Sequence, residues 1–129
     1  MWFLWNLSNI PAGATITNAN LSVYKTAGTT SRTLVAWNTT NGWVETGITW
    51  NNQPATSVQQ SSIASSTTAA IWQYWNVTNA AISQFAQANK NMSIMIRDST
   101  EGSSTTRTET FASKEYATVA NRPQLNVTY

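Results

Sequence analysis

The sequence predicts an all-β protein, an antiparallel β-sandwich of about eight strands with one short helix at about residues 79–89. Three observations lead to this prediction. Apolar residues alternate with polar ones in most segments, as they do in strands that are buried on one face. Clusters of glycine, proline, asparagine and serine separate these segments and are typical of turns. The 129 residues form one domain, 1–129, and a chain of this size buries roughly two-thirds of its unfolded surface.

The strand pattern also predicts the core. The alternating segments are, in chain order, Phe3 to Leu7, Ala19 to Tyr24, Leu34 to Trp37, Ile71 to Val77, Met92 to Ile96, the region of Phe111, and Leu125 to Tyr129. Because neighbouring residues of a strand point to opposite faces, one set of side chains in each segment should face inward. The predicted core is Trp5, Leu7, Leu21, Val23, Trp50, Trp75, Ile94, Ile96, Phe111, Leu125 and Val127.

One segment has helical spacing instead. Thr78 is a good N-cap, and apolar residues then recur at helical intervals up to Asn89. We expect this amphipathic helix to cover one open end of the core. The polar tract from Thr56 to Thr68 and the segment from Asp98 to Thr106 are predicted loops on the rim, where Ser/Thr-rich loops serve as filler or carry function.

The composition indicates the setting. Only 9% of residues are charged, against about 25% in average soluble proteins, and Asn, Ser and Thr make up over a third of the chain. Such a surface is common in extracellular, cell-surface and virion proteins. The lysines and arginines form no run that would predict a nucleic-acid partner. The apolar start from Met1 to Trp5 is far too short for a membrane span.

No catalytic residue and no cofactor are predicted. The chain has no histidine and no cysteine, so the usual general base and the best nucleophile are absent. Glu45, Glu109 and Glu115 could pair as glycosidase carboxylates, but each lies in a segment with a structural explanation. Glu45 is expected to accept turn N–H bonds or to pair with an arginine. Ca²⁺ needs several oxygen ligands, and Asp98 with Glu101 is the only local acidic cluster, so no metal site is predicted.

A pair of aromatic residues is the candidate binding site. Trp72 and Tyr74 alternate with the inward-facing Trp75 segment, so they should lie side by side on the outer surface of the sheet. Such a pair forms a platform on which sugar rings can stack, and Arg97 or Arg107 could add bidentate contacts. Two other interpretations stay open: the helix or a loop covers the pair, or a neighbouring subunit does.

Several motifs occur in a fixed order along the chain. They are Trp5 to Ile16 (WNLSNIPAGATI), Ala19 to Tyr24, Trp43-X-Glu45 followed by Thr49-Trp50-Asn51-Asn52 and Pro54, Asn76-Val77-Thr78, Phe111 to Glu115, and Arg122 to Tyr129. In this order they resemble the DNRLRE-type module, which is related to the disaggregatase repeat of archaeal surface proteins and to a carbohydrate-binding module of alginate lyases. The resemblance covers essentially the whole chain. It implies a jelly-roll-like β-sandwich that is extracellular and mostly non-catalytic.

One departure from that family predicts an interface. Family members carry further N-terminal strands ahead of the Trp5 segment, and a sandwich without them would expose unpaired backbone groups. We therefore predict that Trp2, Phe3 and Leu4 contact a partner strand or another copy of the chain, in an open assembly rather than a dimer. The alternative is that the sequence is a fragment without its upstream strands.

Two functions follow from these expectations. The first is a carbohydrate-binding or adhesion module whose partner is a polysaccharide or glycan. The second is a structural subunit of an extracellular assembly, such as a filament, a surface layer or a virion decoration, completed by a strand from a neighbouring chain.

Overall fold

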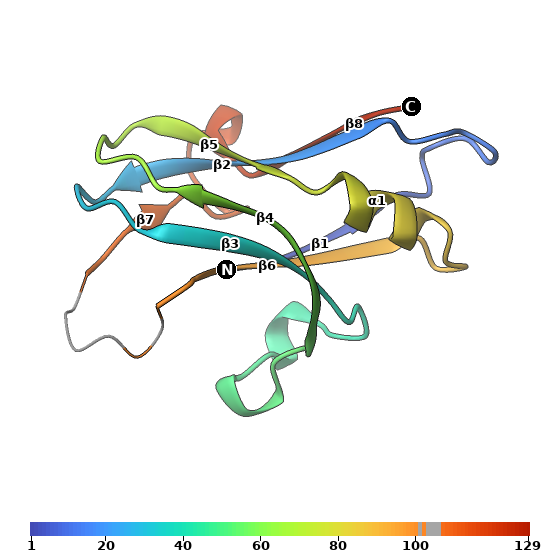
Figure 1. The fold of residues 1–129 in the computed structure, drawn as a ribbon, viewed down its shortest axis with the longest axis horizontal. Helices are drawn as coiled ribbons and strands as arrows, with labels where there is room; N and C mark the ends of the chain where they lie inside the picture. Colours follow the sequence, from blue (N-terminus) through green and yellow to red (C-terminus); the bar gives the residue numbers. More distant parts are fainter. Residues whose placement is uncertain (101, 103–106) are drawn as a thin grey trace.

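The computed structural model describes residues 1–100, 102 and 107–129. Within them the chain forms two packed antiparallel sheets, which are the two layers of strands in Figure 1. The first sheet has the strand order β1-β6-β3-β4, and the second has β5-β2-β7 with β8 also paired to β2. The strands are β1 (Trp2–Asn6), β2 (Asn18–Ala27), β3 (Thr33–Thr39), β4 (Thr56–Ala64), β5 (Ile71–Asn76), β6 (Asn91–Asp98), β7 (Thr110–Phe111) and β8 (Gln124–Thr128). The predicted all-β sandwich is confirmed.

The first sheet is built around its two central strands, β6 and β3. β6 pairs with β1 from Trp2↔Met95 to Asn6↔Asn91, and with β3 along its other edge. Every residue of β6 from Met92 to Ile96 is buried. The second sheet covers the inner face of β6, and side chains that are described below cover its outer face.

The second sheet is built on β2, the longest strand. β5 pairs with one edge of β2, while β8 and β7 share the other edge. The inward-facing residues of β2 are Ala19, Leu21, Val23 and Lys25, and all of them are fully buried. Three short strands therefore depend on one long strand for their position.

The core lies between the two sheets. Leu7, Leu21, Val23, Trp75, Ile94 and Ile96 are buried there, and Trp5, Phe111, Leu125 and Val127 pack against it while partly buried. Trp75 links the sheets, because its Nε1 donates to the Leu34 carbonyl at 3.2 Å. The prediction for Trp50 is wrong: this side chain is 76% exposed. Thr49 begins a capped 3₁₀ turn, η2 (Trp50–Asn52), which turns Trp50 to the outside instead of continuing a strand.

The helix α1 (Thr78–Phe85) closes one end of the sandwich and buries Ala80 and Ala81 (Figure 1). Thr78 is its first residue rather than its N-cap, because the Thr78 hydroxyl accepts the Ala19 N–H at 2.9 Å. The helix also ends earlier than predicted. After Phe85 the chain turns through Lys90, which has a φ of +48°, and enters β6.

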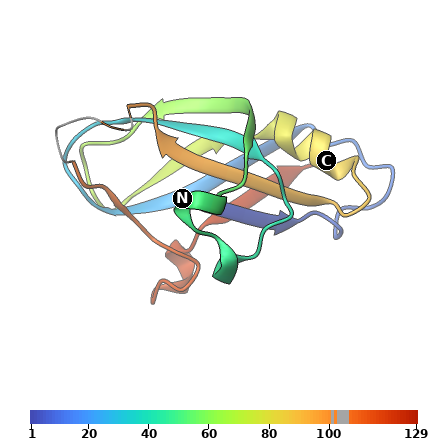
Figure 2. The same cartoon turned by 90° about the horizontal axis from the view of Figure 1, so that it is seen from below.

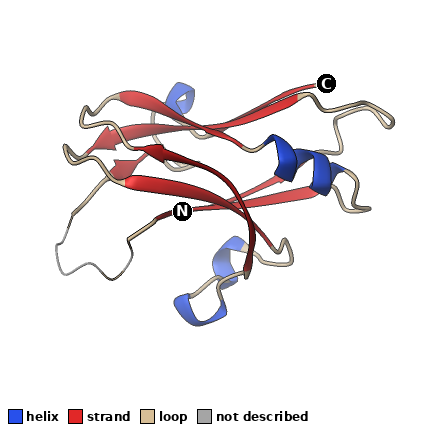
Figure 3. Cartoon of the chain, viewed as in Figure 1, coloured by secondary structure: helices blue, strands red, loops and turns tan. Residues whose placement is uncertain are grey.

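One of the two predicted polar loops differs from expectation. The tract from Thr56 to Thr68 was predicted as a loop, but its first part is β4, the outer strand beside β3. Backbone pairing with β3 suffices for this strand, although its side chains are mostly exposed. The predicted loop from Asp98 to Thr106 lies partly outside the described residues. Figure 3 shows the remaining helical turns outside the strand layers: η1 (Glu45–Gly47), η2 and η3 (Val119–Asn121).

Candidate functional site

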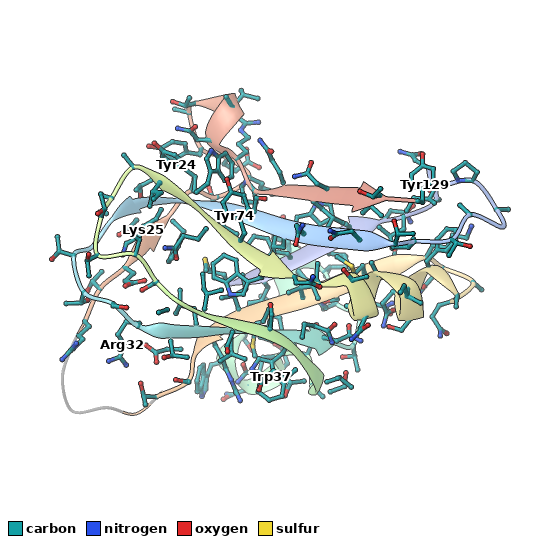
Figure 4. The ribbon with its side chains drawn as sticks, turned by 45° about the horizontal axis from the view of Figure 1, so that its top comes forward. Tyr24, Lys25, Arg32, Trp37, Tyr74 and Tyr129 are labelled. Carbon is teal, nitrogen blue, oxygen red and sulfur yellow. The ribbon has the colours of Figure 1, made fainter. Side chains whose placement is uncertain are left out.

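Three aromatic side chains lie on the outer face of the second sheet. Because the alternate residues of β2 and β5 fill the core, Tyr24, Trp72 and Tyr74 point outward; Figure 4 labels the two tyrosines. Tyr24 lies directly opposite Trp72, and the two rings meet edge to face with their centroids 5.3 Å apart. Tyr74 is 58% exposed, so neither the helix nor a loop covers it. We call Tyr24, Trp72 and Tyr74 the aromatic platform.

Hydroxyl and amide side chains continue along the same face beyond the platform. The strand registers place them in two rows across the sheet, Tyr74–Ser22–Gln124 and Asn76–Asn20–Asn126. Successive rows on one face of a sheet are about 6.8 Å apart. Amide groups supply both donors and acceptors of hydrogen bonds. Ser22 is only 2% exposed, so the accessible polar groups of these rows are the amides. We call Gln124, Asn76, Asn20 and Asn126 the amide rows.

The outward side chains of β2, β5 and β8 carry no charge. Within the described residues, they are Asn18, Asn20, Ser22, Tyr24, Thr26, Trp72, Tyr74, Asn76, Gln124, Asn126 and Thr128. An exposed aromatic side chain can stack against the C–H face of a saturated ring in a ligand, and the amides beside it can form hydrogen bonds with the hydroxyl groups of that ligand. The arrangement therefore suits an uncharged, polyhydroxylated ligand.

The two predicted arginines lie elsewhere. Arg97 belongs to β6 of the first sheet, where its guanidinium stands over the Trp37 ring at 5.4 Å from the centroid. Arg107 and Arg97 both line a hollow of about 440 Å³ that also contains Arg32 and Asp98. The structure thus brings the arginines to one another and not to Trp72 and Tyr74. Alternation along each strand could not have shown this, because it does not tell which sheet a strand joins.

In the same hollow, Arg32 Nε donates to the Asp98 carboxylate. This contact, assisted by hydrogen bonds from Thr100, lowers the pKa of Asp98 from 3.8 to about 2. Arg32 and Asp98 neutralise each other, and Glu109, which contacts Lys25, also lines this hollow.

Tryptophan also covers the outer face of the first sheet. Trp43 Nε1 donates to Ser93 Oγ at 2.8 Å, and Ser93 Oγ lies 2.6 Å from Thr39 Oγ1. The Trp43 ring meets Trp2 edge to face, with centroids 6.3 Å apart. These contacts explain why the outward residues Ser93 and Met95 are buried. Trp43 fixes the segment between β3 and β4 onto the sheet, and we assign it a structural role.

The segment after Trp43 holds Trp50 in the solvent. Asn52 Oδ1 accepts from Thr49 Oγ1 at 2.8 Å, and Asn52 Nδ2 donates to the Gly47 carbonyl at 2.8 Å. Glu45 pairs with Lys114 at 2.5 Å rather than with an arginine, and this hydrogen bond raises the pKa of Lys114. The motif around Glu45 and Trp50 is therefore a hydrogen-bonded turn.

The three candidate carboxylates lie in two places within the described part of the chain. Glu109 is buried and contacts Lys25 Nζ at 3.2 Å, whereas Glu45 and Glu115 both contact Lys114 in the solvent. Among the described residues, no group of three or more His, Cys, Asp or Glu side chains is placed to hold a metal ion; Glu101 lies outside them. No helix in this part of the chain is long and apolar enough to cross a membrane.

The predicted interface residues lie together in β1. Trp2 and Phe3 are half-buried, and Leu4 is 40% exposed. β1 is one of the two outer strands of the first sheet. Figure 2 shows it beside the η1–η2 segment, which is drawn in green.

Comparison with known families identifies the module. The family model of carbohydrate-binding module family 96 matches residues 1–129, and the chain belongs to this family. No curated protein matches the chain.

Proposed function

From membership of a carbohydrate-binding family, we propose that this protein is a non-catalytic module that binds a neutral polysaccharide on the aromatic platform and the amide rows. The observation that carries the proposal is the open, uncharged face on which Tyr24, Trp72 and Tyr74 stand beside the rows of amides. Sugar rings have an apolar C–H face and a rim of hydroxyls, and this surface offers a partner for each.

The platform is ordered before any ligand binds. Trp72 and Tyr24 support each other edge to face. They stand on β5 and β2, whose inner side chains are buried apart from Ile71 at the start of β5. Aromatic side chains have few rotatable bonds, so holding them for a ligand costs little conformational entropy. A site on rigid strands therefore needs no rearrangement of a loop.

The low charge of the chain supports a location outside the cell. Only 9% of residues are charged, and the solvated surface consists mainly of hydroxyls and amides. A module of this kind would act at a cell surface or on a secreted protein, where it would hold its partner against a glycan. Adhesion and attachment of a neighbouring enzyme domain are both consistent with such a role.

Affinity electrophoresis in gels that contain neutral or acidic polysaccharides tests the proposal. The expected result is retardation by a neutral polymer, which is lost in the Trp72→Ala/Tyr74→Ala variant. Trp50→Ala is the matched control, because Trp50 is the more exposed tryptophan but lies outside the platform. If only acidic polymers retard the chain, and Arg97→Ala abolishes this retardation while Trp72→Ala/Tyr74→Ala leaves it unchanged, the site lies in the arginine-lined hollow. Unchanged retardation in every variant would refute both positions.

A second candidate function is a structural subunit of an extracellular assembly. The observation that favours it is the exposed, apolar outer strand β1, whose Leu4 is 40% exposed. The two functions are compatible, since β1 belongs to the first sheet and the platform to the second.

A further inference from the structure

The hydrogen bonds of β1 alternate between its two edges. Met1 exchanges two backbone bonds with Ile96, at 2.7 and 2.9 Å, and the Leu7 N–H donates to the Lys90 carbonyl at 2.8 Å. In an antiparallel pair only every second residue bonds to the neighbouring strand. Phe3 and Trp5 therefore bond to β6 as well. The N–H and C=O groups of Trp2, Leu4 and Asn6 point to the opposite edge, where no strand lies within the described part of the chain.

The sequence of β1 has none of the usual protections, although the η1 region and the segment after β7 flank this edge and are joined by the Glu45–Lys114 pair. Outer strands generally carry lysine, proline, an inward charge or a bulge, which prevent pairing with another molecule. β1 reads Trp-Phe-Leu-Trp-Asn, without charge or proline, and its register with β6 is continuous. The other outer strand of this sheet, β4, is polar and has register shifts against β3. Of the two, β1 is the one suited to pairing.

A groove of about 670 Å³ runs along the same edge. Its walls are β1, the η1 region, and the segment that follows β7. Phe3 and Trp5 stack at 5.3 Å on the inner side of β1. Phe111 of β7 and Pro123, just before β8, also line the groove. Apart from the Glu45–Lys114 pair at its rim and the amino group of Met1, the lining is uncharged.

We propose that a second copy of this chain occupies the groove, with the two β1 strands paired antiparallel about a two-fold axis at Leu4. In this register Leu4 lies opposite Leu4 of the other copy, and Trp2 lies opposite Asn6. All three residues with outward backbone groups then bond at once, and the inner rings of each copy enter the groove of the other. The two first sheets become one continuous eight-stranded sheet across the dimer.

The choice of a second copy as the occupant of the groove follows from the symmetry and charge of β1. A two-fold contact requires a surface that is complementary to itself, and β1 supplies donors and acceptors from the same alternate residues. The strand carries no charge that would repel an identical copy. A register centred on Leu4 pairs all five residues of β1, whereas centring on Phe3 or Trp5 would pair fewer. The structure therefore favours a closed dimer over the open assembly expected from the sequence.

Sedimentation velocity with charge-swapped variants tests both the contact and its register. The wild-type chain should sediment at twice its 14.2 kDa in the micromolar range. Leu4→Lys and Leu4→Glu should each weaken dimerisation roughly tenfold or more, because two like charges would lie directly opposite. An equimolar mixture should restore the dimer, since lysine then meets glutamate. Val58→Lys, at a 60% exposed position of β4, is the matched control and should remain dimeric.

A second readout does not depend on the charged variants. Amide hydrogen exchange should be slow at Trp2, Leu4 and Asn6 in the wild-type dimer, and fast at Trp2 and Asn6 in Leu4→Pro, where position 4 has no amide hydrogen. That variant removes an outward N–H without removing a bond to β6. A wild-type mass of one chain at all concentrations, with fast exchange at these three amides, would overturn the proposal. A wild-type chain that forms polymers of unlimited size would overturn the two-fold register. A mixture of Leu4→Lys and Leu4→Glu that stays monomeric would overturn it too.

Discussion

Replacing Glu109 with glutamine should destabilise the fold by about 3–5 kcal/mol, because it leaves a buried ammonium group without a counter-charge. Lys25 is fully buried on the inner face of β2, and its Nζ lies 3.2 Å from Glu109 Oε1. Ser65 Oγ donates to the same carboxylate oxygen at 2.5 Å, and the Ser66 carbonyl accepts from Lys25. Glutamine has nearly the shape of glutamate, so this change isolates the loss of charge from a loss of packing.

The magnitude is large for a domain whose total stability is of the order of 5–15 kcal/mol. Urea unfolding, followed by tryptophan fluorescence and far-UV circular dichroism, would measure it as a lower midpoint with an unchanged slope. Removing both charges in Lys25→Met/Glu109→Gln should recover most of the loss, since an apolar replacement of a buried ion pair is often neutral or stabilising. A loss below about 1 kcal/mol in Glu109→Gln would refute this reasoning. So would a double variant whose loss equals the sum of the losses in Lys25→Met and Glu109→Gln.

Three further predictions concern stability. Trp75→Ala should cost about 3–5 kcal/mol in urea unfolding, because Trp75 is fully buried; a loss below about 1 kcal/mol would contradict this burial. Arg32 lowers the pKa of Asp98 from 3.8 to about 2. The ionised Asp98 carboxylate therefore stabilises the fold above pH 4, and this stabilisation is lost as pH falls toward 2. Asp98→Asn should therefore cost about 1 kcal/mol at pH 7, after allowance for solvent screening, and nothing below pH 2. Gly28→Ala should cost at least about 1 kcal/mol, because Gly28 has a φ of +103° and an added Cβ would lie 2.8 Å from the Thr108 carbonyl; thermal unfolding measures this.

The sequence predicted the sandwich and two of the three platform residues for the same reason. Period-two alternation tells which side chains of a strand share a face, so Trp72 and Tyr74 could be placed together outside. Tyr24 carries the same signal, as it alternates with Val23 in β2. What alternation could not supply was the register of β2 against β5, which sets Tyr24 opposite Trp72.

The sequence missed the Lys25–Glu109 pair and misassigned Arg97, because both depend on contacts between distant segments, whereas a local turn accounts for Trp50. Lys25 continues the inward series of Leu21 and Val23, but its partner Glu109 lies far along the chain, so nothing local marks the pair. Arg97 was assigned to the platform although β6 joins the other sheet. Trp50 follows the apolar Ile48 at strand spacing, yet the turn that Thr49 and Asn52 form overrides this pattern.

The proposed dimer and the proposed glycan site together make a further prediction. The two-fold axis of an antiparallel strand pair is perpendicular to its sheet, so both second sheets would lie on the same side of the eight-stranded sheet. Their aromatic platforms would then face in one direction, toward one polymer surface. Two linked sites bind a repeating surface more tightly than one, by up to 10²–10⁴-fold.

Leu4→Lys should therefore weaken binding to an insoluble neutral polysaccharide by at least roughly tenfold, while binding to a short soluble oligosaccharide stays unchanged. Depletion assays measure the first affinity and calorimetry the second. The mixture of Leu4→Lys and Leu4→Glu should recover the affinity for the insoluble polymer. An equal loss for both ligands would mean that the substitution damages the platform itself. No loss for either, in a variant shown to be monomeric, would mean that each platform acts alone, because the polymer would then gain nothing from the second copy.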